Sequence, residues 1–180
     1  YLTYPLRRQR QMCIRDRALA GLATRTDVVD ETTYWSYSAY SSQVEEAELH
    51  RTWLAGEPTV APSPVTQAYT NFLLTSVFVD DYVVGAAAVL PCYWLYAQTG
   101  AQITRISDEH PYAAWLHTYH DDEFAQATAQ ALAIVERAFA LAAPQARSRA
   151  ARAYLTACRH EVEFFDQALR VDPDDPGCDE

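Results

Sequence analysis

Apolar residues recur at three- and four-residue spacing along most of the chain, as they do in helices that bury one face. The clearest stripe near the carboxyl end is formed by Phe124, Ala127, Ala131, Ile134, Ala138 and Leu141. Alternating, β-branched strand patterns are scarce, and the chain has only 5 glycines. The pattern therefore predicts an all-α fold, a multi-helix bundle of six or seven helices with short links.

Helix start and stop signals divide the chain. We expect helices over about 1–26, 31–55, 64–79 and 81–104, a shorter segment after His110-Pro111, and long helices opening at Asp121 and Pro144. Ser63 is a natural N-cap, with Pro64 at the first helical position. No internal repeat is apparent, so residues 1–170 are expected to form one domain, followed by an acidic tail at 171–180.

Composition narrows the class of protein. Apolar residues make up 49% of the 180 residues, enough for a sizeable core. The net charge of −10 argues against nucleic acid or an anionic membrane as partner. The uncharged run 82–104 is interrupted by glycine, proline and glutamine, which favours a buried helix over a membrane span. The four cysteines have neither CxxC nor zinc-ligand spacing, so we expect reduced thiols in a cytoplasmic protein.

Residues 9–17, QRQMCIRDR, differ from the rest of the chain. They contain its only methionine, an isolated cysteine and a dense run of arginine. MCIRDR resembles the translated end of a transposase sequencing adapter, and removing 9–17 joins LRR to ALAGLATR as an amphipathic helix. We interpret the segment as an artefactual insertion, and the start on Tyr1 as the sign of a missing amino terminus.

One carboxylate interrupts the apolar stripe predicted for the last helix. The predicted stripe is formed by Tyr154, Cys158, Glu161, Phe165 and Ala168. Burying an ionised carboxylate is costly unless it is paired or protonated, so Glu161 is a candidate for a raised pKa suited to proton transfer. The pattern equally allows Glu161 to lie at the edge of the stripe, in contact with water or an arginine.

The segment LPCYWLY places a thiol beside a proline and several aromatic rings. Cys92 and Tyr96 are four residues apart and share one helix face. Pro91 lacks an N–H group and should open or kink the helix near Cys92. Helix position alone favours an inert, buried thiol, and a reactive thiol lining a pocket is the alternative.

A metal site is a further alternative. Glu46 and His50 are spaced i, i+4, and His160 and Glu163 are spaced i, i+3, as in the di-iron sites of helical bundles. The acidic residues around Glu46 cluster as a solvated face would. We therefore expect chemistry without a metal.

Four segments, SPVTQAYT, LPCYWLYAQTG, HPYAAWLHTY and HEVEFFDQA, together resemble the TenA family. This is the thiaminase II or aminopyrimidine aminohydrolase group of the haem-oxygenase-like helical fold, and the resemblance runs from residue 1 to about residue 170. It implies hydrolysis of aminomethyl-aminopyrimidine, or of thiamine, to hydroxymethylpyrimidine in thiamine salvage, without a cofactor. It also implies a homotetramer.

The resemblance assigns roles to individual residues. Cys92 would be the nucleophile and Glu161 the acid/base residue, since a thiolate adds to an electron-poor pyrimidine and a carboxyl protonates the leaving amine. The residues implied to line the pyrimidine pocket are Tyr1, Tyr69, Tyr96, Tyr119 and Phe164. The family's aspartate that binds the aminopyrimidine precedes the position of Tyr1, so we expect this chain to be a weak catalyst. The alternatives are a haem-oxygenase-like di-iron or cofactor-dependent oxidase, and a non-catalytic regulatory or binding protein.

Overall fold

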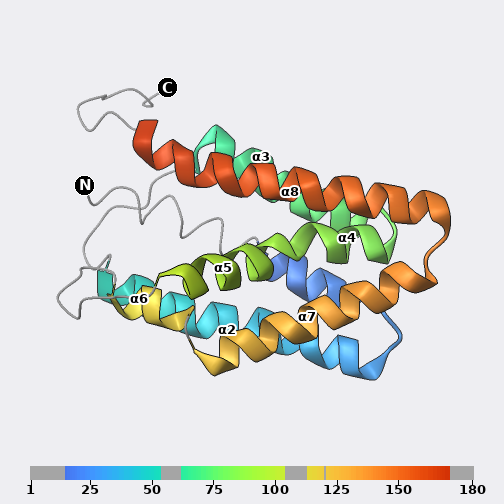
Figure 1. Cartoon of the computed structure of the whole chain (residues 1–180), viewed down its shortest axis with the longest axis horizontal. Helices are drawn as coiled ribbons and strands as arrows, with labels where there is room; N and C mark the ends of the chain where they lie inside the picture. Colours follow the sequence, from blue (N-terminus) through green and yellow to red (C-terminus); the bar gives the residue numbers. More distant parts are fainter. Residues whose placement is uncertain (1–14, 54–61, 104–112, 120, 171–180) are drawn as a thin grey trace.

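The computed structural model describes residues 15–53, 62–103, 113–119 and 121–170, and within these ranges the chain is helical apart from short links (Figure 1). A helix over residues 15–23 is followed by α2 (Val29–Trp53), α3 (Pro64–Phe78), α4 (Tyr82–Val89), α5 (Pro91–Gln102), α6 (Ala113–Thr118), α7 (Asp122–Leu141) and α8 (Pro144–Arg170). The predicted all-α bundle is confirmed. Each helix in these ranges is too short or too polar to cross a membrane.

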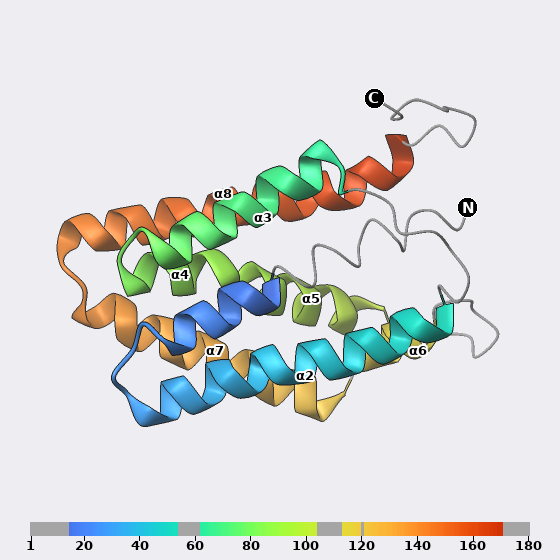
Figure 2. The same ribbon diagram turned by 180° about the vertical axis from the view of Figure 1, so that it is seen from behind.

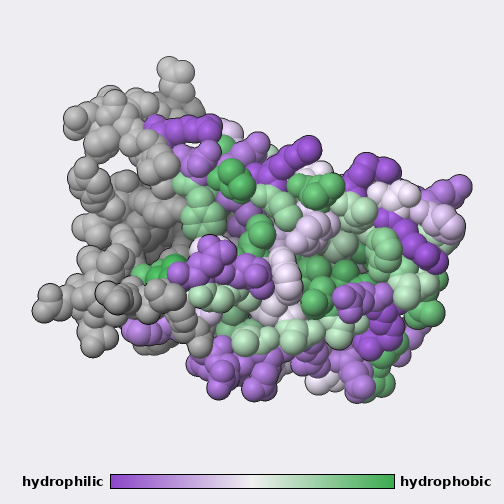
Figure 3. Space-filling view, in the orientation of Figure 1, coloured by the Kyte–Doolittle hydropathy of each residue, from purple (hydrophilic) through white to green (hydrophobic). Residues whose placement is uncertain are grey.

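The helices lie side by side along the long axis of the molecule, with α4 and α5 between α3 and α8 on one side and α2 and α7 on the other (Figures 1 and 2). α4 contacts α3, α7 and α8, and its residues 83–89 are all buried. A Cβ on Gly85 would lie 2.9 Å from the Cα of Val77, so glycine allows α3 and α4 to approach closely. On the surface in Figure 3, hydrophilic residues line much of the outer edges and apolar residues lie between them.

Local signals account for where several helices begin. Ser63 caps α3, and its side chain accepts a hydrogen bond of 3.1 Å from the backbone N–H of Thr66. Asp121 caps α7 by accepting from the N–H of Glu123 at 3.0 Å. The side chain of Ser63 also donates to Gln167 Oε1 at 2.5 Å, which ties the start of α3 to the end of α8. The predicted caps are confirmed.

The single helix predicted over 81–104 is divided at Leu90, between α4 and α5. Leu90 keeps helical backbone angles (φ −55°, ψ −37°), and its carbonyl accepts from the N–H groups of Tyr93 and Trp94 at 3.0 and 2.9 Å. Pro91 has no N–H to donate to the carbonyl four residues earlier. The interruption of the helix beside Cys92, which the presence of Pro91 indicated, is therefore confirmed.

The buried stripe of α8 is displaced from the predicted one. Its most buried described positions are Ala146, Ala150, Ala153, Ala157, Glu161, Phe164 and Gln167. Tyr154 and Cys158 are half-buried, and Phe165 is 40% exposed. The small alanines, rather than the larger side chains, face α4 because they permit close helix packing. Leu141, the last residue of the α7 stripe, is exposed because it lies at the end of its helix.

Part of the expected insertion is helical. Residues 15–17 are continuous with 18–23 in the first described helix. Asp16 is only 4% exposed, and it accepts a hydrogen bond from the side chain of Gln43 on α2. Residues 9–14, Tyr1 and the tail at 171–180 lie outside the described residues.

A buried ionic network holds together the end of the bundle where α2 and α4 begin. Glu31 is 4% exposed, and its Oε1 accepts from Arg137 Nε and Nη2 at 3.1 and 2.9 Å. Its Oε2 accepts from the hydroxyls of Tyr82 and Thr26 at 2.7 and 2.8 Å. Trp35 Nε1 donates to Tyr82 at 2.8 Å. The carboxylate thus links α2, α4, α7 and the chain before α2.

Candidate active site

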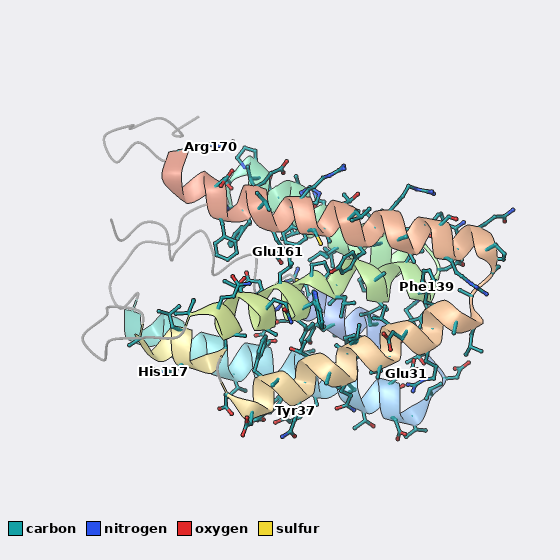
Figure 4. The ribbon with its side chains drawn as sticks, in the orientation of Figure 1. Glu31, Tyr37, His117, Phe139, Glu161 and Arg170 are labelled. Atoms are coloured by element: carbon teal, nitrogen blue, oxygen red, sulfur yellow. The ribbon has the colours of Figure 1, made fainter. Side chains whose placement is uncertain are left out.

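Three helices bring a thiol, a phenol and a carboxyl group into direct contact inside the bundle. The hydroxyl of Tyr69 on α3 lies 3.3 Å from the Sγ of Cys92 on α5, and it donates to Glu161 Oε1 on α8 at 2.8 Å. Tyr96, one turn after Cys92, donates to Glu161 Oε2 at 3.3 Å. Figure 4 shows Glu161 between α8 and α5. The structure therefore joins four of the predicted site residues in one hydrogen-bonded cluster.

The fold places each member of this cluster for a local reason. Cys92 is the second residue of α5, directly after the division at Leu90 and Pro91. Tyr69 lies one turn after Thr66, which hydrogen-bonds the capping Ser63. Glu161 follows the alanine stripe of α8 and is 3% exposed. The question of whether Glu161 lies in the core or at its edge is settled in favour of the core.

Burial dominates the electrostatics of the cluster. It raises the pKa of the Cys92 thiol, as does the nearby charge of Glu161, while Arg15 and the Tyr69 hydrogen bond act in the opposite direction. Burial also raises the pKa of Glu161 above 4.5, and hydrogen bonds from Tyr69, Cys92 and Tyr96 offset this only in part. Glu161 is thus a carboxyl group whose protonated form is favoured by the fold, as a proton donor requires.

Aromatic rings lie next to the carboxyl group. The ring of Tyr96 lies 5.1 Å from that of Tyr119 and 5.8 Å from that of Phe165, measured between centroids. Phe164, expected to line the pocket, is 1% exposed and packs edge-on against Phe165 at 5.8 Å. Phe165 is the ring that contacts Tyr96, although the sequence pattern assigned it to the core. Tyr96 therefore contacts the rings of Tyr119 and Phe165 as well as the carboxyl group of Glu161.

Tyr69 is fully buried, as Phe164 nearly is, and its ring stacks on that of His160 with 5.2 Å between the centroids and 16° between the planes. Burial, followed by the charges of Cys92 and Glu161, raises its pKa, so its hydroxyl keeps its proton. Its hydroxyl lies between the thiol and the carboxyl group and contacts both.

Of the residues of the metal alternative, the structure describes the side chains of His160 and Glu163. No group of three or more histidine, cysteine, aspartate or glutamate side chains within the described ranges is placed to hold a metal ion. His160 packs against Tyr69 and Phe72, and its Nδ1 lies 3.5 Å from Glu163 Oε2. The side chains of Glu46 and His50 lie outside the described part of the structure.

Sequence reasoning missed one residue of this region. Arg15 lowers the pKa values of both Cys92 and Glu161 through its positive charge. A signal for it was present: Arg15 lies three and four residues before Ala18 and Leu19, which are both fully buried. Arg15 lies within the segment 9–17, which the sequence pattern marked as an insertion.

The helical arrangement is that of the haem-oxygenase-like all-α fold, which solved structures of TenA proteins share. The crystal structure of a TenA family transcription regulator from a Silicibacter species superposes with a TM-score of 0.84 at 22% identity, covering 94% of this chain and 81% of that one. A TenA homologue from P. horikoshii gives 0.81 at 21% identity, covering 94% and 82%.

Residues 29–171 match the TENA/THI-4/PQQC family, and the chain belongs to that family. The chain is 51% identical over 159 residues to the thiamine biosynthesis multifunctional protein ThiED of Corynebacterium efficiens. This match covers 86% of this chain and 22% of that protein. The chain is 28% identical over 110 residues to the aminopyrimidine aminohydrolase of Bacillus subtilis, covering 61% and 47%. The chain therefore spans about a fifth of the multifunctional relative and about half of the aminohydrolase.

Proposed function

We propose that this chain is a hydrolase that cleaves the exocyclic C–N bond of an aminomethyl-aminopyrimidine or of thiamine, with Cys92 as nucleophile and Glu161 as acid/base residue. The observation that carries the proposal is the Tyr69 hydroxyl, which contacts Cys92 Sγ at 3.3 Å and Glu161 Oε1 at 2.8 Å. Membership of the TENA/THI-4/PQQC family supports it. So do relatives named for thiamine biosynthesis and for aminopyrimidine hydrolysis. The product would be the hydroxymethylpyrimidine used in thiamine salvage.

In the first step the ionised Glu161 takes the proton of the Cys92 thiol, and the sulfur adds to an electron-poor carbon of the pyrimidine ring. The electron pair gained by the ring expels the leaving group, so the bond between the exocyclic methylene and nitrogen breaks. Glu161 protonates the departing amine. Its raised pKa suits this role, because burial shifts the carboxyl group toward the protonated form from which it donates.

In the second step water replaces the amine. The ionised Glu161 accepts a proton from water, the hydroxyl adds to the exocyclic methylene, and the carbon–sulfur bond breaks to restore the aromatic ring. Glu161 then gives this proton to the departing thiolate, so the net reaction exchanges an amine for a hydroxyl group and both Cys92 and Glu161 end in their starting states. In this scheme the chain's own side chains supply the nucleophile and the proton.

Two observations support a flat, aromatic substrate. The ring of Tyr96 lies 5.1 Å from that of Tyr119 and 5.8 Å from that of Phe165, measured between centroids, and aromatic faces favour stacking with heterocycles. Tyr96 also holds Oε2 of Glu161 through its hydroxyl at 3.3 Å. A ring stacked against Tyr96 would therefore lie next to the acid/base group. Tyr1 would contribute a further ring, and we propose a homo-oligomeric enzyme.

The proposal is tested by hydrolysis of aminomethyl-aminopyrimidine under single-turnover conditions with enzyme in excess. Cys92→Ser is expected to abolish formation of hydroxymethylpyrimidine, because a hydroxyl is a far weaker nucleophile than a thiolate. Cys158→Ser is the matched control, since Cys158 is the other free cysteine of the described residues and lies half-buried one turn before Glu161. Equal rates for the parent chain and Cys92→Ser would remove the nucleophile assignment.

A further inference from the structure

His160 on α8 stacks against a ring that belongs to the candidate active site. Measured between centroids, its imidazole lies 5.2 Å from the ring of Tyr69 on α3, with 16° between the planes. It also lies 5.3 Å from the ring of Phe72, at 42°. Such distances are typical of attractive aromatic pairs. The next residue on α8 is Glu161, which accepts a hydrogen bond of 2.8 Å from the Tyr69 hydroxyl. Two consecutive residues of α8 therefore hold one side chain of α3, one by its ring face and the other by its hydroxyl.

The imidazole is held by ring faces rather than by a polar partner at its buried nitrogen. Nδ1 of His160 is shielded from solvent and has no hydrogen-bond partner among the described residues. It lies 3.5 Å from Oε2 of Glu163, beyond the usual range for an N–H···O hydrogen bond. The Glu163 side chain is 58% exposed, so water weakens that contact further. The orientation of the imidazole therefore depends on its contacts with the rings of Tyr69 and Phe72.

The backbone that carries Tyr69 is fixed by separate contacts. Gln167 on α8 accepts from Ser63 Oγ at 2.5 Å and donates to Thr66 Oγ1 at 3.4 Å. Tyr69 lies one turn after Thr66, so these bonds set the position of its backbone along α8. The freedom that remains is rotation of the Tyr69 side chain about its two torsion angles. A flat group stacked on the ring face opposes movement of the ring perpendicular to its plane. Such movement would change the distances from its hydroxyl to the thiol and to the carboxyl group.

We propose that His160 is a positioning residue of this site, whose imidazole holds the ring of Tyr69 so that the phenol hydroxyl stays between the thiol and the carboxyl group. This role rests on the proposed function and deepens it. When the thiol proton moves to the ionised Glu161, the Tyr69 hydroxyl gives its own proton to Oε1 and takes the proton of Cys92. Tyr69 is unchanged by this exchange, which requires both distances to be short at once. A ring that is free to swing would keep one contact and lose the other.

Alkylation of Cys92 by iodoacetamide at about pH 8, followed by peptide mass spectrometry, tests this role without requiring turnover. His160→Leu keeps the bulk of the side chain but removes its flat face. It is expected to slow alkylation about five-fold, because the thiolate loses a well-placed hydrogen bond from Tyr69 and one such bond changes an equilibrium by roughly that factor. His160→Phe restores a flat ring and is expected to stay within about two-fold of the parent chain. In a Tyr69→Phe background, His160→Leu is expected to change the rate by less than about two-fold, because the hydroxyl that it positions is absent.

Glu163→Gln is the control, because it removes the other contact of His160 and is expected to leave alkylation unchanged. Loosened packing alone would expose the buried thiol and speed up alkylation, so the direction of the change separates positioning from a general loss of stability. An unchanged or faster reaction in His160→Leu, or an equal slowing in the Tyr69→Phe background, would overturn the role of His160.

Two further results keep the outcomes distinct. If His160→Leu does not fold, as judged by thermal unfolding, His160→Gln also lacks an aromatic ring and must show the same slowing. The proposed function fails instead when Cys92→Ser leaves hydrolysis of aminomethyl-aminopyrimidine intact, whatever the alkylation rates are.

Discussion

Two buried glutamates at different places in the bundle have opposite electrostatic settings. Glu31 and Glu161 are 4% and 3% exposed, and each accepts hydrogen bonds from tyrosine hydroxyls. Figure 4 shows them well apart, with Glu31 near α7 and Glu161 between α8 and α5. Burial raises the pKa of both, but at Glu31 the hydrogen bonds from Tyr82, Arg137 and Thr26 and the charge of Arg137 bring it below 4.5. At Glu161 the pKa remains above 4.5.

The difference lies in the partner groups. Glu31 has a guanidinium directly on one oxygen, which makes its ionised form the stable one and prevents it from exchanging protons near neutral pH. Glu161 is hydrogen-bonded by phenols and lies next to a thiol. Burial alone therefore does not identify a catalytic carboxylate. A buried carboxyl group whose direct partners are uncharged is the one available for acid/base chemistry.

Replacing each of the two glutamates with glutamine is expected to give the largest difference between the two sites. Glu161→Gln is expected to reduce hydrolysis about a thousand-fold, since general acid–base catalysis contributes roughly 10²–10⁴-fold, with little change in the free energy of unfolding. Glu31→Gln is expected to leave the rate per folded molecule unchanged and to lower the free energy of unfolding by about 1–2 kcal/mol. The pair with Arg137 is only half-shielded, because the arginine side chain is 49% exposed.

Single-turnover rates and urea unfolding of both variants measure this contrast. The distinction between the two glutamates is contradicted if Glu31→Gln and Glu161→Gln lose hydrolysis to the same extent at equal fractions folded. Arg137→Gln serves as a second check on the structural side, because it removes the same ion pair from its exposed partner.

Removing one tyrosine hydroxyl at each site gives a smaller effect. Tyr69 and Tyr82 donate to their glutamates at nearly equal distances, 2.8 and 2.7 Å. Tyr69→Phe is expected to slow hydrolysis about ten-fold or more, because it removes the bridge between thiol and carboxyl. Tyr82→Phe is expected to cost about 1–2 kcal/mol of unfolding free energy at constant rate, since Glu31 loses a donor and Trp35 loses its acceptor. An equal loss of rate in both variants would contradict the assignment of the two sites.

Much of the local structure could be predicted from the sequence. The caps at Ser63 and Asp121 and the division at Pro91 depend on a few neighbouring residues, and each is present. The carboxylate within the α8 stripe was also visible, because helical spacing marks an out-of-place Glu161. What spacing could not decide was the register of the stripe: the alanines face α4 because of how closely the two helices pack, and close packing is a tertiary property.

The electrostatic character of each glutamate could not be predicted in the same way. Tyr69 is 92 residues from Glu161, and Arg137 is 106 residues from Glu31. No local pattern indicates which distant side chain will reach a buried carboxylate. The family resemblance singled out Cys92 and Glu161, whereas it gave no reason to consider Arg15 or the network around Glu31.

The smallest expected effect is a pair of opposite pH dependences of stability. The folded-state pKa of Glu31 lies below 4.5, so its contribution to stability is complete above pH 4.5 and is lost as the pH falls through the folded value. The folded-state pKa of Glu161 lies above 4.5, so its contribution is complete below pH 4.5 and is lost as the pH rises through the folded value. Urea unfolding between pH 3.5 and pH 7 measures both against the glutamine variants.

The stability advantage of the parent chain over Glu31→Gln is expected to shrink as the pH falls below 4.5. Relative to the parent chain, Glu161→Gln is expected to gain stability as the pH rises above 4.5, because glutamine resembles the protonated carboxyl and carries no charge to bury. Each change is expected to be about 1 kcal/mol or less, after allowance for solvent screening. Parallel pH dependences in the two variants would mean that the two glutamates share one electrostatic setting, and the distinction between a structural and a catalytic carboxylate would then rest on the thiol alone.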